Sequence, residues 1–359
     1  MRRQVLQDAY RWLTLLAVVF VVLLIGTGGW VRLSESGLGC PTWPKCYDHR
    51  LAAHDTYHAL VEFSNRCVIV AVGAIVVLVL IGAMRRQERR RSLWLALGLL
   101  AGYVGEAVLG GLTVLFKLAP ELVAAHLVLA MALLVDAVAL HWRVSGRGAE
   151  TAMPVAGAVP VAGAVPVAGA VPVAGAVPVA GAVSGAESGA RAAATGPEVR
   201  WLARLLLAAV ATTIVLGAVA TGSGPYAGTP DTPRFAFRFS SAVELHAVVG
   251  VFLFGLIVAL CFTLRATRAP QRVCKVHALV TAAAALQGAI GYVQYFGGLP
   301  PGLVEAHIIG AALLLIAAMR LNLELGSLTG TSISQAQWKN GQGHGSFPIA
   351  HVKTTEGVA

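Results

Sequence analysis

Charged side chains are scarce in this chain, at 12% of 359 residues, whereas 57% of the residues are hydrophobic. The mean hydropathy is +0.74. That composition is the one of a multi-span membrane protein rather than of a water-soluble domain. The formal net charge of +10 does not indicate a nucleic-acid partner, because the basic residues fall mostly in one set of loops between apolar runs.

A second absence concerns the N-terminus, where no small-residue cleavage site follows the first apolar run. Arg2 and Arg3 precede that run, which is long enough to span a membrane, so we expect it to be a span and not a cleaved signal peptide. Eight runs reach the roughly 17–25 residues that a spanning helix needs. Each must be helical because hydrocarbon offers no partner for exposed backbone groups. The predicted spans are 12–32, 58–83, 93–115, 121–142, 201–222, 242–264, 273–296 and 302–322.

Lysine and arginine are also scarce in every second loop, and this asymmetry predicts the orientation. Basic residues gather before the first span and in the second and sixth loops, whereas Glu35, Asp48 and Asp231 lie in the intervening loops. The positive-inside rule then places both termini in the cytoplasm and the protein in the cell membrane. The positive net charge is therefore explained by the orientation of the chain in the lipid bilayer and indicates no other partner.

The segment between the fourth and fifth spans differs from the rest. Residues 154–183 are five copies of PVAGAV, and a proline every sixth residue prevents a continuous helix. We interpret this segment as a low-complexity cytoplasmic linker. The sequence after Leu325 is polar and rich in Gly and Ser, which predicts a disordered tail. The expected organisation is an N-terminal half (1–143), a linker (144–199), a C-terminal half (200–325) and a cytoplasmic tail (326–359).

The chain contains an internal repeat. Residues 121–134, ELVAAHLVLAMALL, return as 302–315, GLVEAHIIGAALLL, so that His126 aligns with His307. Four spans per half is an even number, so both halves run the same way through the membrane and are expected to be related by a pseudo-two-fold axis along its normal. We therefore predict an all-α integral membrane protein, with eight transmembrane helices forming two tandem four-helix bundles.

Each half carries polar side chains at matching depth. The repeat aligns His246 with Asn65, so the second half has the pair His246 and His307 where the first half has Asn65 and His126. The three histidines lie roughly 8–9 Å below the extracytoplasmic ends of their spans, at about 1.5 Å per residue. Two histidines at one depth in one bundle can ligate a haem iron from opposite faces. Histidines hydrogen-bonded between helices, or on a proton path, are the alternative.

Further polar residues lie at the outer end of the second span. His58, Glu62 and Asn65 are spaced i, i+4, i+7 and share one helical face, and Arg66 follows them. A carboxylate inside a membrane is costly, which makes Glu62 a functional candidate suited to proton handling beside an oxidisable substrate. The structural alternative is an ion pair of Glu62 with Arg66 or Arg32.

Cysteine is rare, with five residues in the chain. Cys40 and Cys46 lie in the first outer loop, on the oxidising side of the membrane, where a disulfide is expected. The loop between them is short and contains Pro41 and Pro44, so both a redox-active and a purely structural bond are consistent with the sequence. The other three cysteines lie in or near spans and read as ordinary small apolar residues.

Taken together, these features resemble the haem A synthase family. The resemblance covers all eight spans, roughly residues 10–325. It rests on GGWVRLSESGLGCPTWPKC (28–46), on EFSNR at the start of the second span, and on LGGLTVL (109–115) followed by the AH of the fourth. Members convert haem O to haem A for cytochrome oxidase by oxidising a ring methyl to a formyl group, with oxygen thought to come from water.

The resemblance also implies roles for residues. In the C-terminal half, His246 and His307 would ligate a haem b. In the N-terminal half, which holds the substrate haem O, Glu62 would be the catalytic carboxylate and the pair Cys40 and Cys46 would be needed for full function. Expected partners are haem O synthase, the cytochrome oxidase assembly machinery and an electron acceptor that the sequence does not identify. The sequence also leaves open whether the chain forms a homo-oligomer.

One position departs from the family pattern. Many members have histidine where this chain has Asn65, and an amide is a poor iron ligand. His126 would then be the only protein ligand of the substrate haem unless His58 substitutes, and Asn65 and Arg66 would line that site. One histidine leaves a position on iron open, as a transient substrate needs.

Two other classes of protein fit these sequence features less well. A b-type cytochrome subunit that transfers electrons without modifying haem would need a closed ligand pair in each half and gives Glu62 no role. A transporter is disfavoured because no span is broken by paired Gly and Pro near the midplane.

Overall fold

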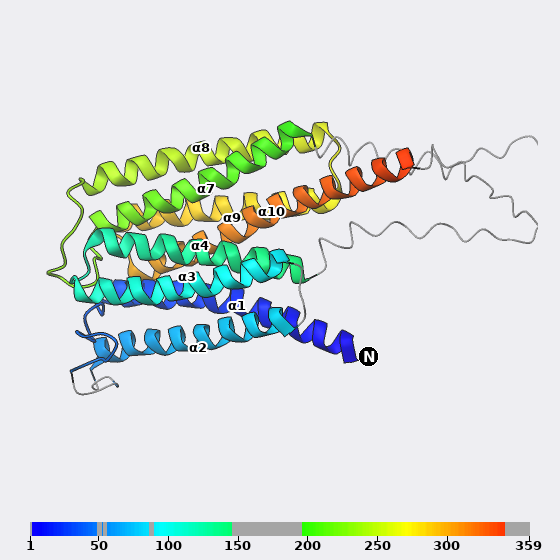
Figure 1. The fold of residues 1–359 in the computed structure, drawn as a ribbon. Coiled ribbons are helices and arrows are strands. Elements are labelled where there is room, and N and C mark those ends of the chain that lie inside the picture. The colour runs from blue at the N-terminus through cyan, green and yellow to red at the C-terminus, as the bar shows by residue number, and fades with distance from the viewer. Residues whose placement is uncertain (1, 49–51, 53–55, 86–89, 146–195, 342–359) are drawn as a thin grey trace, which may run out of the picture.

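The computed structural model describes residues 2–48, 52, 56–85, 90–145 and 196–341. These residues form eight α-helices and no β-strand, and Figure 1 shows the helices running lengthwise beside one another. The helices are α1 (Arg2–Leu33), α2 (Tyr57–Arg85), α3 (Arg90–Leu115), α4 (Pro120–Val144), α7 (Pro197–Ser223), α8 (Phe239–Ala266), α9 (Gln271–Phe296) and α10 (Pro301–Gly341).

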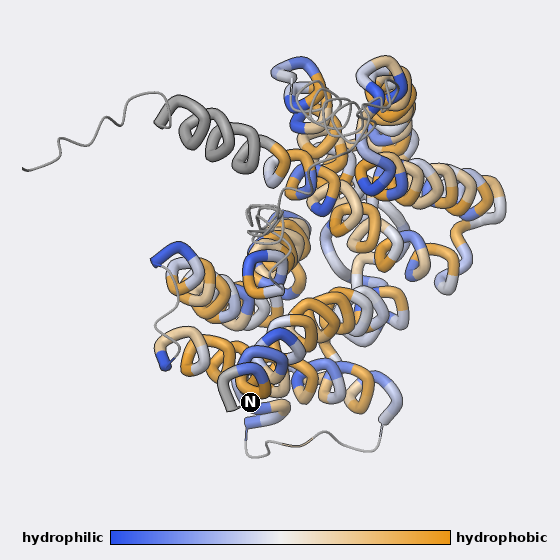
Figure 2. Tube along the Cα trace, turned by 90° about the vertical axis from the view of Figure 1, so that its right-hand side faces the viewer, coloured by the Kyte–Doolittle hydropathy of each residue, from blue (hydrophilic) through white to orange (hydrophobic). Residues whose placement is uncertain are grey.

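All eight of these helices are long and apolar enough to cross a membrane. Each predicted span lies inside one helix, so the prediction of an eight-span, all-α chain is confirmed. Large apolar side chains such as Val70, Phe252 and Tyr292 remain at least 60% exposed on helix surfaces, and Figure 2 shows hydrophobic residues on outward as well as inward faces. Lipid covers such surfaces in a protein of this kind.

The helices of each half contact one another in a closed ring. In the first half α1 packs on α2 and α4, and α3 packs on α2 and α4; in the second half α7 and α9 contact α8 and α10 in the same way. The two rings meet where α1 and α4 contact α10 and where α4 contacts α7. The arrangement as two tandem four-helix bundles, and the symmetry axis between them, stay predictions.

The repeat extends to the backbone conformation of the turns that follow α3 and α9. Lys117 and Leu118 have φ values of 48° and 62°, and their counterparts Gly298 and Leu299 have 77° and 59°. The Leu118 N–H donates to the Thr113 carbonyl at 2.7 Å, and the Leu299 N–H donates to the Gln294 carbonyl at the same distance. A left-handed pair followed by proline at the start of the next helix therefore closes both turns.

One boundary differs from the expectation. The tail was expected to be disordered from residue 326, yet α10 continues to Gly341, so the described part of the tail is helical. No proline follows Pro301 within this helix. Every later residue therefore has the N–H that a helical hydrogen bond needs, and no proline ring clashes with the preceding turn. The membrane-spanning part ends near Leu328. The PVAGAV linker and residues 342–359 lie outside the described residues.

Arg32, at the end of α1, ties the two halves together. Its Nε donates to the Tyr226 carbonyl at 2.6 Å and its Nη2 donates to the Thr221 carbonyl at 2.8 Å. Nearby, the Gly37 N–H donates to the Gly228 carbonyl at 3.1 Å. The guanidinium of Arg32 thus bonds to the second half and not to Glu62.

We expect Arg32→Ala to lower the thermal midpoint of unfolding of the full chain in detergent. The substitution removes charge-assisted hydrogen bonds worth about 1.5–3 kcal/mol each and leaves two part-buried carbonyls without these donors. The control is Arg265→Ala, which truncates an exposed arginine at the far end of α8. Equal midpoints for the two variants would contradict the role of Arg32.

Candidate functional site

A pair of histidines lies inside the second half. His246 from α8 and His307 from α10 have ring centroids 6.1 Å apart, with their planes at 69°. His246 Nδ1 lies 2.9 Å from the Thr213 carbonyl. A carbonyl can only accept, so Nδ1 carries the proton and Nε2 keeps its lone pair for a ligand. The buried Nδ1 of His307 has no hydrogen-bond partner in the described part of the chain.

The spacing of the two rings fits a haem iron held between them. Two imidazoles that ligate one metal from opposite sides have ring centres roughly 6 Å apart, because each metal–nitrogen bond is about 2 Å long. Glycines make room for both rings. A Cβ added at Gly217 of α7 would lie 3.2 Å from Cε1 of His246, and one at Gly291 of α9 would lie 3.3 Å from Cε1 of His307. The donor set and its surroundings therefore suit the haem b that the resemblance implies.

His126 repeats part of this arrangement in the first half. A Cβ at Gly110 of α3 would lie 3.3 Å from its Cε1, just as Gly291 meets His307. The neighbour of the ring differs, however. His126 Nδ1 lies 2.9 Å from Oε2 of Glu106, a short contact that is poorly aligned for a hydrogen bond. Glu106 was not among the residues predicted for the site, although a carboxylate within an apolar span is the signal that points to it.

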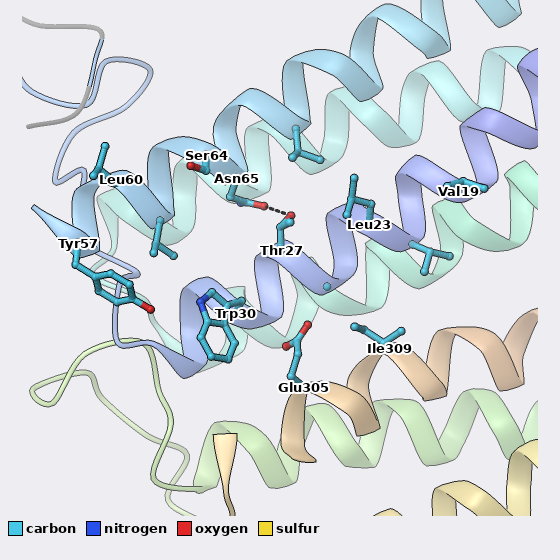
Figure 3. Close-up of a pocket in the computed structure, with 14 residues that line it drawn as sticks. Val19, Leu23, Thr27, Trp30, Tyr57, Leu60, Ser64, Asn65, Glu305 and Ile309 are labelled. Atoms are coloured by element: carbon cyan, nitrogen blue, oxygen red, sulfur yellow. Dashed lines mark hydrogen bonds between the residues drawn. The ribbon is translucent and has the colours of Figure 1, made fainter. Parts of the chain in front are cut away.

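The side chain of Asn65 is held by α1. Its Oδ1 accepts a hydrogen bond from Thr27 Oγ1 at 2.7 Å, as Figure 3 shows. It also lines a cavity of about 710 Å³ between α1, α2 and α10. The two positions that the repeat aligns with a histidine pair are thus held by different neighbours, Asn65 by α1 and His126 by α3.

Glu62 and Arg66 fix the loop between α1 and α2. Glu62 is buried, its Oε2 accepts the Cys40 N–H at 2.7 Å, and its Oε1 contacts Arg66 Nη2 at 2.6 Å. Arg66 also donates to the carbonyls of Cys40, Thr42 and Lys45 at 3.1 Å. The ion pair with Arg66, considered from the sequence, is therefore present.

The expected disulfide between Cys40 and Cys46 is present, and both residues are fully buried. Next to it, His58 contacts Ser36 Oγ through Nδ1 at 3.1 Å. The backbone of His58 packs so closely on Gly39 that a side chain at Gly39 would collide with it. His58 is thus attached to the loop that Glu62 and Arg66 hold.

These features define a class: a polytopic helical membrane protein of two repeated halves, with histidine sites and a disulfide loop near one end. The family model of cytochrome oxidase assembly proteins, COX15-CtaA, matches residues 10–319, and the chain belongs to this family. The resemblance drawn from the sequence motifs is thereby confirmed.

Curated relatives are similar over a shorter stretch. Haem A synthases from Shewanella oneidensis, Lysinibacillus sphaericus and Halalkalibacterium halodurans are 32% identical over 133 residues, 29% over 119 and 29% over 115, respectively. Each match covers 32% of this chain. The chain spans 38–40% of the length of these relatives.

We expect Arg66→Ala to speed reduction of the Cys40–Cys46 disulfide by a phosphine reductant at least about tenfold. Each lost charge-assisted hydrogen bond contributes about 1.5–3 kcal/mol against local opening of the loop. Arg66→Lys should restore only part of the protection, because an ammonium lacks the fork that reaches several carbonyls. The control is Arg265→Ala, and an unchanged rate in Arg66→Ala would show that the guanidinium does not hold the loop.

Proposed function

We propose that the chain is a haem A synthase, a membrane oxidoreductase that converts haem O to haem A by stepwise oxidation of a ring methyl to a formyl group. The observation that carries this proposal is the 6.1 Å histidine pair within a member of the cytochrome oxidase assembly family. The same chain holds a second, different histidine position beside a buried carboxylate, so one half suits a fixed cofactor and the other suits a molecule that is changed.

In this proposal His246 and His307 hold haem b, which supplies one-electron redox chemistry when bound. The Thr213 carbonyl orients the His246 ring and presents Nε2. Gly217 and Gly291 have no side chains that would crowd the rings of His246 and His307. The protein's contribution is a rigid, apolar and closed ligand pair, which suits electron transfer because no position on the metal stays open to other ligands.

His126 is the proposed protein ligand of the substrate haem. The Glu106 carboxylate lies 2.9 Å from its Nδ1, and a carboxylate there orients a ligating imidazole and makes it a better donor. Asn65 offers no imidazole where the repeat would place a second histidine, so one histidine would hold the substrate haem. Binding through a single histidine would let haem O enter the site and haem A leave it.

Glu62 is the proposed catalytic carboxylate, and it would accept protons released as the methyl group is oxidised. Both of its oxygens are engaged, by Cys40 and by Arg66. Proton transfer to Glu62 would weaken its pairing with Arg66, which also holds the loop. Glu62, Arg66, His58 and the disulfide would thus form one unit at the mouth of the substrate site.

The proposed orientation rests on charge. The basic residues at the start of α1 and at the ends of α2 and α8 favour cytoplasmic termini, which would put the histidine positions and the disulfide loop on the extracytoplasmic side. Haem O synthase and the cytochrome oxidase assembly machinery are the partners that this function implies.

Co-expression with a haem O source tests the function. Extraction of the haems followed by chromatography should show haem A or its hydroxylated precursor in cells that carry the chain, and neither in cells with haem O alone. If neither product forms while the protein still binds haem, the chain would be a b-type electron-transfer subunit instead.

Single substitutions distinguish the proposed roles of the two halves. We expect Glu62→Ala and His126→Ala each to abolish conversion and to leave the spectrum of the bis-histidine haem in place. His307→Ala should remove that spectrum, because a single histidine cannot keep the iron six-coordinate. Loss of the spectrum in Glu62→Ala, or its persistence in His307→Ala, would contradict the assignment; absorption spectra of the purified variants provide the measurement.

A further inference from the structure

The cavity beside Asn65 is a groove on the membrane-facing surface. It lies between α1, α2 and the start of α10, and Figure 3 shows Asn65, Thr27, Trp30 and Glu305 around it. Its volume is about 710 Å³. Large apolar lining residues such as Leu23 and Leu60 are at least 45% exposed, so the groove opens toward the surface that lipid covers.

Glu305 places a carboxyl group in this apolar groove. Its buried Oε2 has no hydrogen-bond partner among the residues that the structure describes. The α1 backbone makes room for it, since a Cβ at Gly29 would lie 2.6 Å from Oε2 and one at Gly26 would lie 3.3 Å from Oε1. An intramembrane carboxyl group without an ion partner marks a functional site by default.

Two further features of the lining suit a flat polar ring. The Asn65 oxygen is taken by Thr27, so the amide nitrogen is what Asn65 can offer to a ligand, as a donor. Trp30 and Tyr57, at the outer end of the groove, add aromatic faces for stacking. The remaining lining, from Val19 to Val68, is almost wholly aliphatic and suits a hydrocarbon tail.

The groove is also close to the histidine pair. Glu305 and His307 are two residues apart on α10, which turns the helix by about 200°. His307 faces His246 inside the second half, whereas Glu305 lines the groove against α1. A ligand in the groove would therefore lie across one helix from the pair.

We propose that this groove binds a membrane quinone as the two-electron acceptor of the reaction. The inference rests on the proposed function, which oxidises its substrate and needs such an acceptor. The ring would lie among Glu305, Asn65 and Trp30, with the carboxyl O–H of Glu305 and the Asn65 amide donating to the quinone carbonyls. The prenyl tail would follow the aliphatic lining into the bilayer.

The redox balance of the first oxidation closes with this acceptor. The substrate methyl and one water give a hydroxymethyl group, two electrons and two protons. The quinone takes up two electrons and two protons, and both of its carbonyls become hydroxyls. Glu305 delivers one of these protons to the oxygen that it faces and is reprotonated afterwards, and the second proton comes from solution. The two protons released at the substrate equal the two taken up at the quinone, and the quinone takes both electrons, so this step needs no other oxidant.

Binding is measured first, without reference to haem conversion. Ubiquinone-1 is titrated into the full chain in detergent, and the quenching of tryptophan fluorescence is followed. We expect saturable quenching that Trp30→Phe largely removes, because Trp30 lines the groove. Absence of saturable quenching, or equal competition by the redox-inert prenyl alcohol geranylgeraniol, would overturn the proposal, since the groove would then not recognise a quinone ring.

Two neighbouring glycines provide a matched pair of variants. Gly29→Ala pushes a methyl group against Glu305, whereas Gly28→Ala has nothing within 4 Å of the added carbon. We expect Gly29→Ala and Glu305→Ala to weaken ubiquinone-1 binding at least about tenfold, the effect of losing one hydrogen bond to a buried group. Gly28→Ala should bind as the wild type does. Equal affinity in all variants would refute the site.

Glu305→Gln separates binding from reduction. The amide of glutamine still donates a hydrogen bond, so affinity should stay within about threefold of the wild type. It carries no transferable proton, so quinol formation coupled to haem conversion should fall at least about tenfold. Unimpaired quinol formation in Glu305→Gln would contradict the proton-delivering role.

The outcomes distinguish this inference from the proposed function. If ubiquinone-1 binds in a Glu305-dependent way but no haem A forms with any acceptor, the function is wrong and the quinone site stands. If haem A forms at the wild-type rate in Glu305→Ala and Gly29→Ala, the function stands and the quinone site is wrong.

Discussion

Polar groups inside hydrocarbon need partners, and this constraint explains how the chain is arranged. Arg32 bonds to two carbonyls of the other half, and Arg66 bonds to Glu62 and to several carbonyls of the disulfide loop. Thr27 bonds to Asn65 in the same way. These contacts lie near one end of the bundle. They fix the loops there, so that the apolar helices below need only pack against each other and against lipid.

The few polar atoms left without partners then become informative. Nδ1 of His307 and Oε2 of Glu305 are buried and unpartnered in the described part of the chain. They lie on opposite sides of the same stretch of α10, one in the histidine pair and the other in the lipid-facing groove. Asp136 of α4 also has a partnerless oxygen, against Gly98, and nothing in the structure explains it.

Much of the fold could be predicted from the sequence because the signals are local. Hydropathy predicts the eight helices, and their number agrees with the structure. The spacing and the side of the membrane predict the pairing of Cys40 with Cys46. The repeat predicts that His126 and His307 are equivalent, and both indeed pack on a glycine of the preceding helix.

The rest depends on how each helix is rotated about its axis, which an almost uniformly apolar span hardly encodes. Asn65 contacts α1 and lines the groove, although the repeat aligned it with His246. Glu106 reaches His126, and Glu305 enters a space built largely by the first half. The helical continuation of α10 to Gly341 was missed because a polar composition alone does not end a helix.

Under the proposed function the two halves have diverged, with one closed histidine pair and one site with a single histidine. Electron paramagnetic resonance of the purified full chain, prepared without haem O, tests this claim most directly. We expect the signal of one bis-histidine haem per chain, and we expect His246→Ala to abolish this signal. Two bis-histidine haems per chain would contradict it.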